Sequence, residues 1–220
     1  YGGPSGGASF EWAFAHSEQL NGAEVIFDTE DVEGAFDLCI ASPGISEFSD
    51  FYLSGKRASK EIVSEVEFAW RESDEASKWV AITGTNGKTT TTSLTSFILE
   101  RAGWRACAVG NIGDTCIEAV GKRNAAVSND LESTSSSDAV QVAPIYVVEM
   151  SSYQLASTTD FAPDVAVILG ITPDHLTWHK THENYAQAKF KLLANLKRSG
   201  GVAVLDAIND KVRSKVRELK

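Results

Sequence analysis

The chain has 220 residues, of which 43% are hydrophobic and 23% are charged, an ordinary composition for a globular protein of one large or two small domains. The formal net charge of −10 argues against a general nucleic-acid-binding surface, but it allows a local cationic pocket for phosphates. No apolar run has the length of a membrane span and no signal peptide is visible, so we expect a cytoplasmic protein. The three cysteines lack paired metal spacing, which indicates buried free thiols.

The first part of the chain, to about residue 73, alternates helix-like and strand-like segments. Residues 9–20 have the apolar spacing of a helix, and a second helix is predicted to begin near Glu67. The polar residues 74–78 are predicted to link this part to the next. Short apolar runs predict buried strands at residues 24–27, 37–41 and 62–66.

The second part of the chain shows the same alternation. Because strands that alternate with helices form parallel βαβ units, we expect an α/β fold with a mostly parallel sheet. The predicted strands are residues 79–82, 105–109, 144–149, 164–169 and 202–205. The predicted helices are residues 88–102, 115–120 and 183–198.

Two details of this part are also predicted from pattern. Leu94, Phe97 and Ile98 are spaced to form the buried face of the helix over residues 88–102. Residues 128–138 hold five serines among other polar residues, which is typical of a surface loop.

The sequence Thr-Gly-Thr-Asn-Gly-Lys-Thr-Thr at residues 83–90 lies between a predicted strand and a predicted helix. Such a turn directs backbone N–H groups and a helix N-terminus at one point, which suits a phosphate. Lys88 adds a cation for the β- and γ-phosphates, and the Thr89 hydroxyl can bind Mg²⁺. The general motif has glycine where Ile82 stands, so a plain strand-to-helix turn is the alternative. The candidate ATP-binding residues are Gly84, Thr85, Asn86, Gly87, Lys88, Thr89 and Thr90.

Polar side chains also follow two other predicted strands. Ligands of open α/β sheets bind at the carboxyl ends of the strands, so these side chains are candidates for a site. Glu149 suits a Mg²⁺ ligand or a water-positioning group, although a strand-end glutamate can also face solvent. His175, next to Asp174, can bind a metal or a phosphate, although a lone loop histidine is more often a surface residue.

Two further features are weaker indications of a functional site. His179 and His182 lie close to His175, but their spacing does not match a usual zinc signature and no cysteine is near. Lys189 lies inside the predicted helix over residues 183–198, where pattern alone favours a solvated lysine with a packed stem.

Together these segments resemble the Mur ligases, which join an amino acid to a carboxylate with ATP. The Ser-Ser-Tyr-Gln-Leu form after Glu149 favours the D-glutamate-adding members of the family. Ala-Ser-Pro-Gly-Ile at residues 41–45 resembles the first-domain loop that contacts UDP, and the resemblance covers most of residues 36–206. The segments that follow the family's order and approximate spacing are residues 83–90, 110–113, 149–155, 172–175 and 185–189.

The resemblance implies roles for single residues. Lys88 and Thr89 would hold the ATP phosphates and one Mg²⁺, and Glu149 would share that ion. His175 would ligate a second Mg²⁺, and Lys189 would react with CO₂ to a carbamate, an oxygen donor of the kind that a hard cation prefers. The implied substrates are UDP-N-acetylmuramoyl-L-alanine and D-glutamate, joined through an acyl phosphate. The residues implied to face the UDP-sugar are Ser42, Gly44, Asn111 and Gln154.

The resemblance also implies a domain organisation. Residues 1–73 would be part of a Rossmann-like domain that binds the UDP substrate, and residues 74–220 a P-loop central domain, truncated at its C-terminal end. The family's third domain, which closes over ATP, has no counterpart, so we expect ATP binding without completed turnover.

Three alternatives stay open. One is a ligase like folylpolyglutamate synthetase, one is a nucleotide-binding module without ligase chemistry, and one is an inert fragment. The set of Glu149, His175 and Lys189 argues against the module, because a simple switch needs no second metal site.

Overall fold

The computed structural model describes residues 26, 29–133 and 143–218, with residues 126–133 as backbone only. The predicted helix over residues 9–20 lies outside the described residues, as does the strand predicted over residues 24–27 apart from Ile26. Among the helices of the described part, none is both long and apolar enough to cross a membrane. All three cysteines are free thiols, and Cys116 is buried.

A small parallel sheet begins the described chain. Strand β1 (Phe36–Ala41) pairs with β2 (Ser59–Ser64), and helix α2 (Asp50–Ala58), which the sequence analysis did not predict, connects them. Helix α3 (Glu65–Glu72) follows β2 directly. The strand predicted over residues 62–66 therefore ends two residues early. The reason is that Ser64 caps α3, its hydroxyl accepting a hydrogen bond from the Glu67 backbone N–H.

A larger sheet of five strands has the order β4-β5-β3-β6-β7, and every neighbouring pair is parallel. This arrangement confirms the predicted α/β fold with a parallel sheet. Each observed strand lies within one or two residues of its predicted range. The strands are β3 (Lys78–Thr83), β4 (Ala106–Gly110), β5 (Ile145–Glu149), β6 (Val165–Ile168) and β7 (Val202–Leu205).

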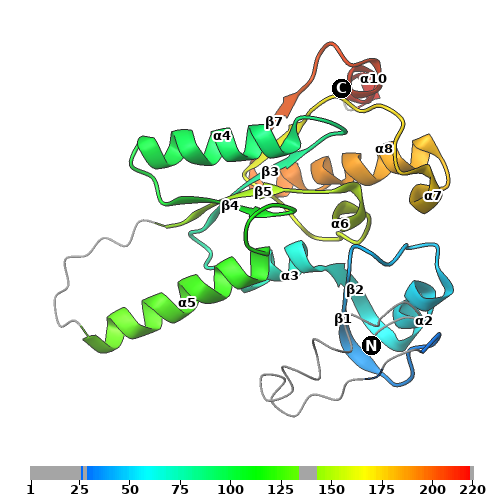
Figure 1. Ribbon diagram of the computed structural model, residues 1–220, viewed down its shortest axis with the longest axis horizontal. Coiled ribbons are helices and arrows are strands. Elements are labelled where there is room, and N and C mark those ends of the chain that lie inside the picture. The colour runs from blue at the N-terminus through cyan, green and yellow to red at the C-terminus, as the bar shows by residue number, and fades with distance from the viewer. Residues whose placement is uncertain (1–25, 27–28, 134–142, 219–220) are drawn as a thin grey trace.

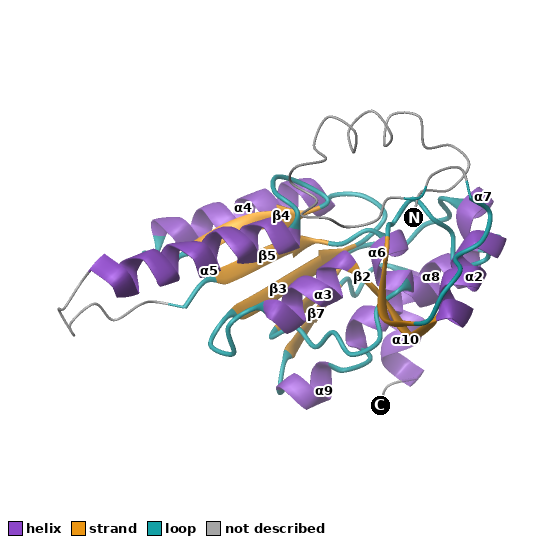
Figure 2. Ribbon diagram, turned by 90° about the horizontal axis from the view of Figure 1, so that it is seen from below, coloured by secondary structure: helices purple, strands orange, loops and turns teal. Residues whose placement is uncertain are grey.

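Helices cover both faces of the larger sheet. Helix α4 lies on one face, and α3, α5 and α8 lie on the other (Figure 1). Seen from below, α5 and α3 lie over the larger sheet and run roughly along its strands, with the smaller sheet beside them (Figure 2). The helices after β3 are α4 (Lys88–Arg101), α5 (Cys116–Ser133), α6 (Ser152–Ala156), α7 (Leu176–His179), α8 (His182–Phe190), the 3₁₀ turn η2 (Lys191–Leu193), α9 (Leu196–Ser199) and α10 (Asp210–Glu218).

The main hydrophobic core lies on the α3–α5–α8 face. Trp79, Tyr146 and Phe161 form its aromatic centre, with ring centroids of Trp79 4.7 Å from Tyr146 and 6.0 Å from Phe161. The α4 face has a smaller buried cluster around Ile82 and Val147. The larger core therefore packs α3, α5 and α8 against one face of the larger sheet.

The prediction that α4 buries Leu94, Phe97 and Ile98 is wrong. These side chains are 54–56% exposed, while Thr92 and Ser96 face the sheet. The small side chains of Thr92 and Ser96 let the helix backbone approach the strands closely. The threonine run at the start of α4 carries no apolar stripe, so the sequence left the rotation of the helix unspecified.

Two other predictions need correction. Residues 128–133, predicted as a loop, continue α5, because each residue added to a formed helix costs little; residues 134–138 lie outside the described part. The helix predicted over residues 183–198 is broken into α8, η2 and α9. Asn195 leaves helical geometry at the start of α9, and its side-chain amide donates to the Thr159 carbonyl, 2.8 Å away, which anchors this segment to the loop after α6.

Candidate functional site

The loop between β3 and α4 lies at the carboxyl edge of the larger sheet, where ligands of open α/β sheets bind. Gly84 passes so close to Leu169 that a Cβ on it would lie 2.6 Å from the Leu169 Cβ. Gly87 has φ 81°, in the left-handed region that favours glycine, and precedes α4 as its N-cap. Within the described residues no side chain caps α4, so the N–H groups of its first turn can bind an anion.

The polar side chains of this loop divide into two groups. Asn86, Thr89 and Thr90 are exposed at the start of α4. The Lys88 ammonium donates to the Thr85 carbonyl, 3.0 Å away, so it lies folded against the loop. These residues could meet a phosphate or a bound cation without a rearrangement of the core.

Thr85 makes several hydrogen bonds inside the protein. Its hydroxyl oxygen accepts from the Thr172 N–H at 3.0 Å and lies 3.0 Å from the Tyr185 hydroxyl. The Thr85 backbone N–H donates to the Gly170 carbonyl at 2.9 Å. Thr85 therefore ties the loop to the segment after β6 and to α8.

Glu149, at the end of β5, is only 2% exposed and pairs in register with Ile82 of β3. One carboxylate oxygen, Oε1, accepts from the side-chain amide of Asn111 at 2.8 Å. The other, Oε2, is buried without a hydrogen-bond partner among the described residues. A buried carboxylate oxygen without a partner is costly, and a cation at this place would satisfy it.

Asn111 thus contacts Glu149 in this structure, where the resemblance implied a contact to the UDP-sugar. The close approach depends on Gly110, because a Cβ there would come 2.6 Å from the Glu149 carbonyl oxygen. No pattern in the sequence predicted this contact between Asn111 and Glu149.

Lys189 is 1% exposed and lies behind the loop. Its ammonium donates to the Gly84 carbonyl at 2.9 Å and lies 4.7 Å from the centroid of the Tyr185 ring. Burial lowers the pKa of Lys189 to about 7, repulsion from Lys88 adds to the shift, and Asp174 and Glu149 oppose it. An uncharged amine is therefore accessible at neutral pH, and the pattern-based alternative of a solvated lysine is wrong.

His175 begins α7 in the left-handed conformation, with φ 51°. Its backbone N–H donates to the Asp174 carboxylate at 2.8 Å, and its ring packs on that of Tyr153 with centroids 4.9 Å apart. The side chain is 46% exposed, so the ring can reach a ligand. Glu149 is the last residue of β5 and His175 follows β6, and these two strands lie on either side of β3.

His179 is the residue of this region whose place the sequence did not predict. It is fully buried, and its Nε2 lies 2.9 Å from the Ser152 hydroxyl oxygen. Burial, with smaller contributions from the charges of Lys189 and His175, lowers its pKa to about 4, so the ring is neutral at physiological pH. Among the described residues, the side chains close enough to share one metal ion are Glu61, Glu67 and Asp160, and all three form ion pairs with Arg71. His175, His179 and His182 do not form such a group.

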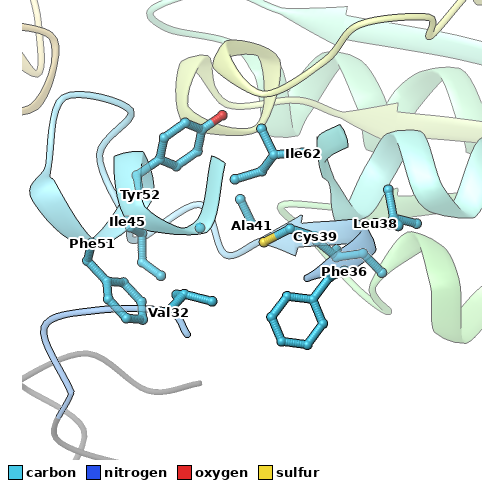
Figure 3. Close-up of a pocket in the computed structure, with 11 residues that line it drawn as sticks. Val32, Phe36, Leu38, Cys39, Ala41, Ile45, Phe51, Tyr52 and Ile62 are labelled. Atoms are coloured by element: carbon cyan, nitrogen blue, oxygen red, sulfur yellow. The ribbon is translucent and has the colours of Figure 1, made fainter. Parts of the chain in front are cut away.

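The remaining substrate candidates lie apart from one another. Gln154 is 7% exposed, and its side-chain oxygen accepts from the Ser151 backbone N–H at 2.8 Å in a capping box of α6. Ser42 and Gly44 are exposed in the turn after β1. Next to this turn, mostly apolar side chains of β1, β2 and α2 line a partly open pocket of about 190 Å³ (Figure 3), and none of the described residues that line it is charged.

Comparison with known sequences places this chain in a protein family. Residues 82–220 match the family described as Mur ligase middle domain. The chain is 38% identical over 192 residues to UDP-N-acetylmuramoylalanine–D-glutamate ligase of Alkaliphilus oremlandii (strain OhILAs), an alignment that covers 87% of this chain and 38% of the relative. It is 43% identical over 162 residues to the same enzyme of Alkaliphilus metalliredigens (strain QYMF), covering 74% and 31%.

Among solved structures, a UDP-N-acetylmuramoyl-L-alanyl-D-glutamate–2,6-diaminopimelate ligase matches with a TM-score of 0.49 and 15% identity, over 92% of this chain and 49% of that one. The chain spans 31–38% of the length of the two curated relatives.

Proposed function

The chain belongs to the Mur ligase family, and from this premise we propose that it binds ATP and Mg²⁺ for the ligation of D-glutamate to UDP-N-acetylmuramoyl-L-alanine in peptidoglycan synthesis. The observation that carries the proposal is the buried pair of Lys189 and Glu149 beside the loop. Lys189 meets the Gly84 carbonyl, and Glu149 keeps one buried oxygen without a partner among the described residues. Because ATP is a cytoplasmic metabolite, we place the reaction in the cytoplasm.

The donor set suits hard divalent cations. In this proposal Thr89 and Glu149 hold one Mg²⁺, and His175 holds a second together with a carbamate on Lys189. When bound, such ions neutralise the negative charge that gathers on the phosphates during the transfer. The orphaned Oε2 atom of Glu149 supports the first site, because it lacks a neutralising partner among the described residues.

The lowered pKa of Lys189 supports the carbamate. CO₂ reacts only with the uncharged amine. The amine nitrogen forms a bond to the carbon of CO₂ and releases a proton, which gives the carbamate. An ordinary lysine is almost fully protonated at neutral pH, whereas a pKa of about 7 leaves a large fraction of Lys189 uncharged. The carbamate would add two oxygen donors to the buried nitrogen that now lies 2.9 Å from the Gly84 carbonyl oxygen.

The reaction proposed for the whole enzyme has two steps. A carboxylate oxygen of the UDP-sugar-alanine attacks the γ-phosphorus of ATP, and the bond between that phosphorus and the ADP oxygen breaks. The amine of D-glutamate then attacks the acyl carbon of the resulting acyl phosphate, so that phosphate leaves and an amide forms. Lys88 and the N–H groups of α4 hold and orient the phosphates, so this chain contributes mainly positioning and electrostatics.

We also propose the division of the chain at about residue 73. Residues 1–73 would contact the UDP part of the substrate, with Ser42 and Gly44 in the turn after β1. Residues 74–220 would hold ATP, with Asn111 and Gln154 on the side toward the UDP-sugar. The hydrogen bond of the Ser46 hydroxyl to the Trp178 carbonyl, 3.1 Å long, supports a shared site because it brings the two parts together next to His175.

Calorimetry with ATP, with and without Mg²⁺, tests the nucleotide site. We expect ATP to bind in both conditions and more tightly with Mg²⁺. Separate titrations with UDP-N-acetylmuramoyl-L-alanine and with a folate test which second substrate the chain binds. Binding of the UDP-sugar alone supports the proposal, while binding of the folate would favour the folylpolyglutamate synthetase-like alternative.

Incubation with ¹³C-bicarbonate and Mg²⁺ tests the modification. Wild-type protein should show a carbamate carbon signal in ¹³C NMR, and Lys189→Met protein should not. An equal signal in both proteins would assign the carbamate to another amine and would remove Lys189 from the proposal.

A further inference from the structure

His179 joins three elements that each carry a candidate metal ligand. Its imidazole Nε2 is 2.9 Å from the hydroxyl oxygen of Ser152, which lies three residues after Glu149. Its backbone N–H donates to the His175 carbonyl at 3.0 Å, within α7. Its carbonyl accepts from the Asn184 side-chain amide at 2.8 Å, in the first turn of α8, the helix of Lys189.

Aromatic rings enclose the same imidazole. The ring of Tyr153 stacks on it with an interplanar angle of 21° and centroids 5.6 Å apart, and the Tyr185 ring meets it edge-on at 5.4 Å. Tyr153 also contacts His175, and Tyr185 also contacts the Lys189 ammonium. A displacement of His179 would therefore be transmitted to both candidate ligands.

The choice of histidine at this place is informative. The side chain is fully buried, and its Nδ1 has no hydrogen-bond partner among the described residues. An apolar ring would fill the space without leaving a buried nitrogen unpaired, so packing alone would favour phenylalanine. What histidine adds is the hydrogen bond to Ser152.

We propose that His179 is a positioning residue that, through its bond to Ser152 and its aromatic contacts, holds Glu149, His175 and Lys189 at the separation that Mg²⁺ binding requires. This inference rests on the proposed function, since it concerns the same metal region. His179 itself does not touch the ion. Its contribution is to restrict the motion of three ligands that come from separate elements, so that less conformational entropy is lost when the cation binds.

Four variants separate the hydrogen bond from the ring. Ser152→Ala removes the bond and keeps the imidazole, and His179→Phe removes the bond and keeps an aromatic ring. His179→Gln keeps a group that can bond to Ser152, and so it is the conservative rescue. Tyr52→Phe is the matched control, because it removes another buried hydroxyl contact, the 3.1 Å bond between the Tyr52 and Ser157 hydroxyls.

The measurement is the gain in ATP affinity that Mg²⁺ produces, from calorimetry of residues 1–220 with and without the ion. We expect Ser152→Ala and His179→Phe to reduce this gain five- to tenfold and to leave the Mg²⁺-free affinity unchanged. The double variant should lose no more than the worse single variant, because both remove one bond. His179→Gln should keep more of the gain than His179→Phe, and Tyr52→Phe should keep all of it. The ¹³C carbamate signal should fall in the same order.

Two results would overturn the inference. One is that Mg²⁺ increases the ATP affinity of both Ser152→Ala and His179→Phe by as much as it increases that of the wild type. The other is an equal loss of affinity with and without Mg²⁺, which would mean that His179 only supports the fold. If His179→Phe does not fold, Ser152→Ala and His179→Gln decide the matter by the same criteria. Wild-type protein without any Mg²⁺-dependent gain would refute the proposed function itself, and this inference with it.

Discussion

The candidate phosphate loop (residues 83–90) and the polar cluster, made of the candidate ligands Glu149, His175 and Lys189 with the neighbouring His179, meet at one edge of the sheet but are built differently. The loop is one continuous segment, and several of its polar groups are exposed. The cluster comes from three separate elements, and all of its members except His175 are buried. The loop therefore owes its chemistry to backbone geometry, while the cluster owes its chemistry to burial and to charges brought together by the fold.

The two regions are also physically joined. Thr85 of the loop contacts Tyr185 of α8, and Lys189 donates to the Gly84 carbonyl. Repulsion from Lys88 contributes to the lowered pKa of Lys189. Substitutions can therefore be chosen to act on the loop alone, on the cluster alone or on the link between them.

The largest effect is expected in the cluster, from Lys189→Met. The folded pKa of Lys189, about 7, is below the value of about 10.4 in an unfolded chain, so between these values the unfolded state binds more protons. The free energy of unfolding of the wild type should thus rise with pH in that window, by up to about 1.4 kcal/mol per pH unit. Urea unfolding between pH 7 and 10 should show a shallower rise for Lys189→Met, and parallel curves would contradict the prediction.

The next largest effect is expected in the loop, from Lys88→Ala. The substitution removes a charge-assisted contact to phosphate, so ATP affinity should fall by about 1.5–3 kcal/mol, with or without Mg²⁺. Calorimetry measures this loss, and Lys60→Ala, an exposed lysine of β2 paired with Asp37, is the control. Unchanged affinity in Lys88→Ala would refute the nucleotide site.

Glu149→Gln should distinguish the cluster from the loop. Glutamine can still accept the hydrogen bond from Asn111, but it lacks the negative charge that a cation requires. The Mg²⁺-dependent part of the ATP affinity should fall by about 1.5–2 kcal/mol, and the Mg²⁺-free affinity should stay the same or rise. An equal fall in both conditions would show that Glu149 acts through the fold and not through a metal.

The smallest effect is expected for the link between the regions. Tyr185→Phe removes the hydroxyl that lies 3.0 Å from the Thr85 hydroxyl and keeps the ring above Lys189. The free energy of unfolding should fall by about 1 kcal/mol, a typical value for one lost hydrogen bond. Thermal unfolding measures the change, and an unchanged midpoint would indicate that the bond adds nothing to stability.

Much of the fold follows from local pattern in the sequence. Residues 79–82, 145–148 and 202–205 are short apolar runs bounded by polar residues, proline or glycine, and each lies in a strand. The alternation with helices was enough to predict a parallel sheet. The glycine positions of the loop could be read in the same way, because backbone geometry depends on the residue itself and its neighbours.

What the sequence left undecided depended on contacts between distant residues. The apolar spacing of Leu94, Phe97 and Ile98 predicted the wrong buried face for α4, since the fit of Thr92 and Ser96 to the sheet decided its rotation. The helix predicted over residues 183–198 is interrupted after Phe190, and Asn195 in the interrupted part bonds to a residue 36 positions away.

The clearest division is between Lys88 and Lys189. The sequence alone determined the place of Lys88, because it follows a glycine that turns a strand into a helix, a relation of neighbouring residues. Only the tertiary structure decided the state of Lys189. Burial against Gly84 and Tyr185, with Lys88 nearby, lowers its pKa, and these neighbours are separated from it by up to 105 residues of chain. A shifted pKa depends on the local dielectric and on nearby charges, and the fold determines both.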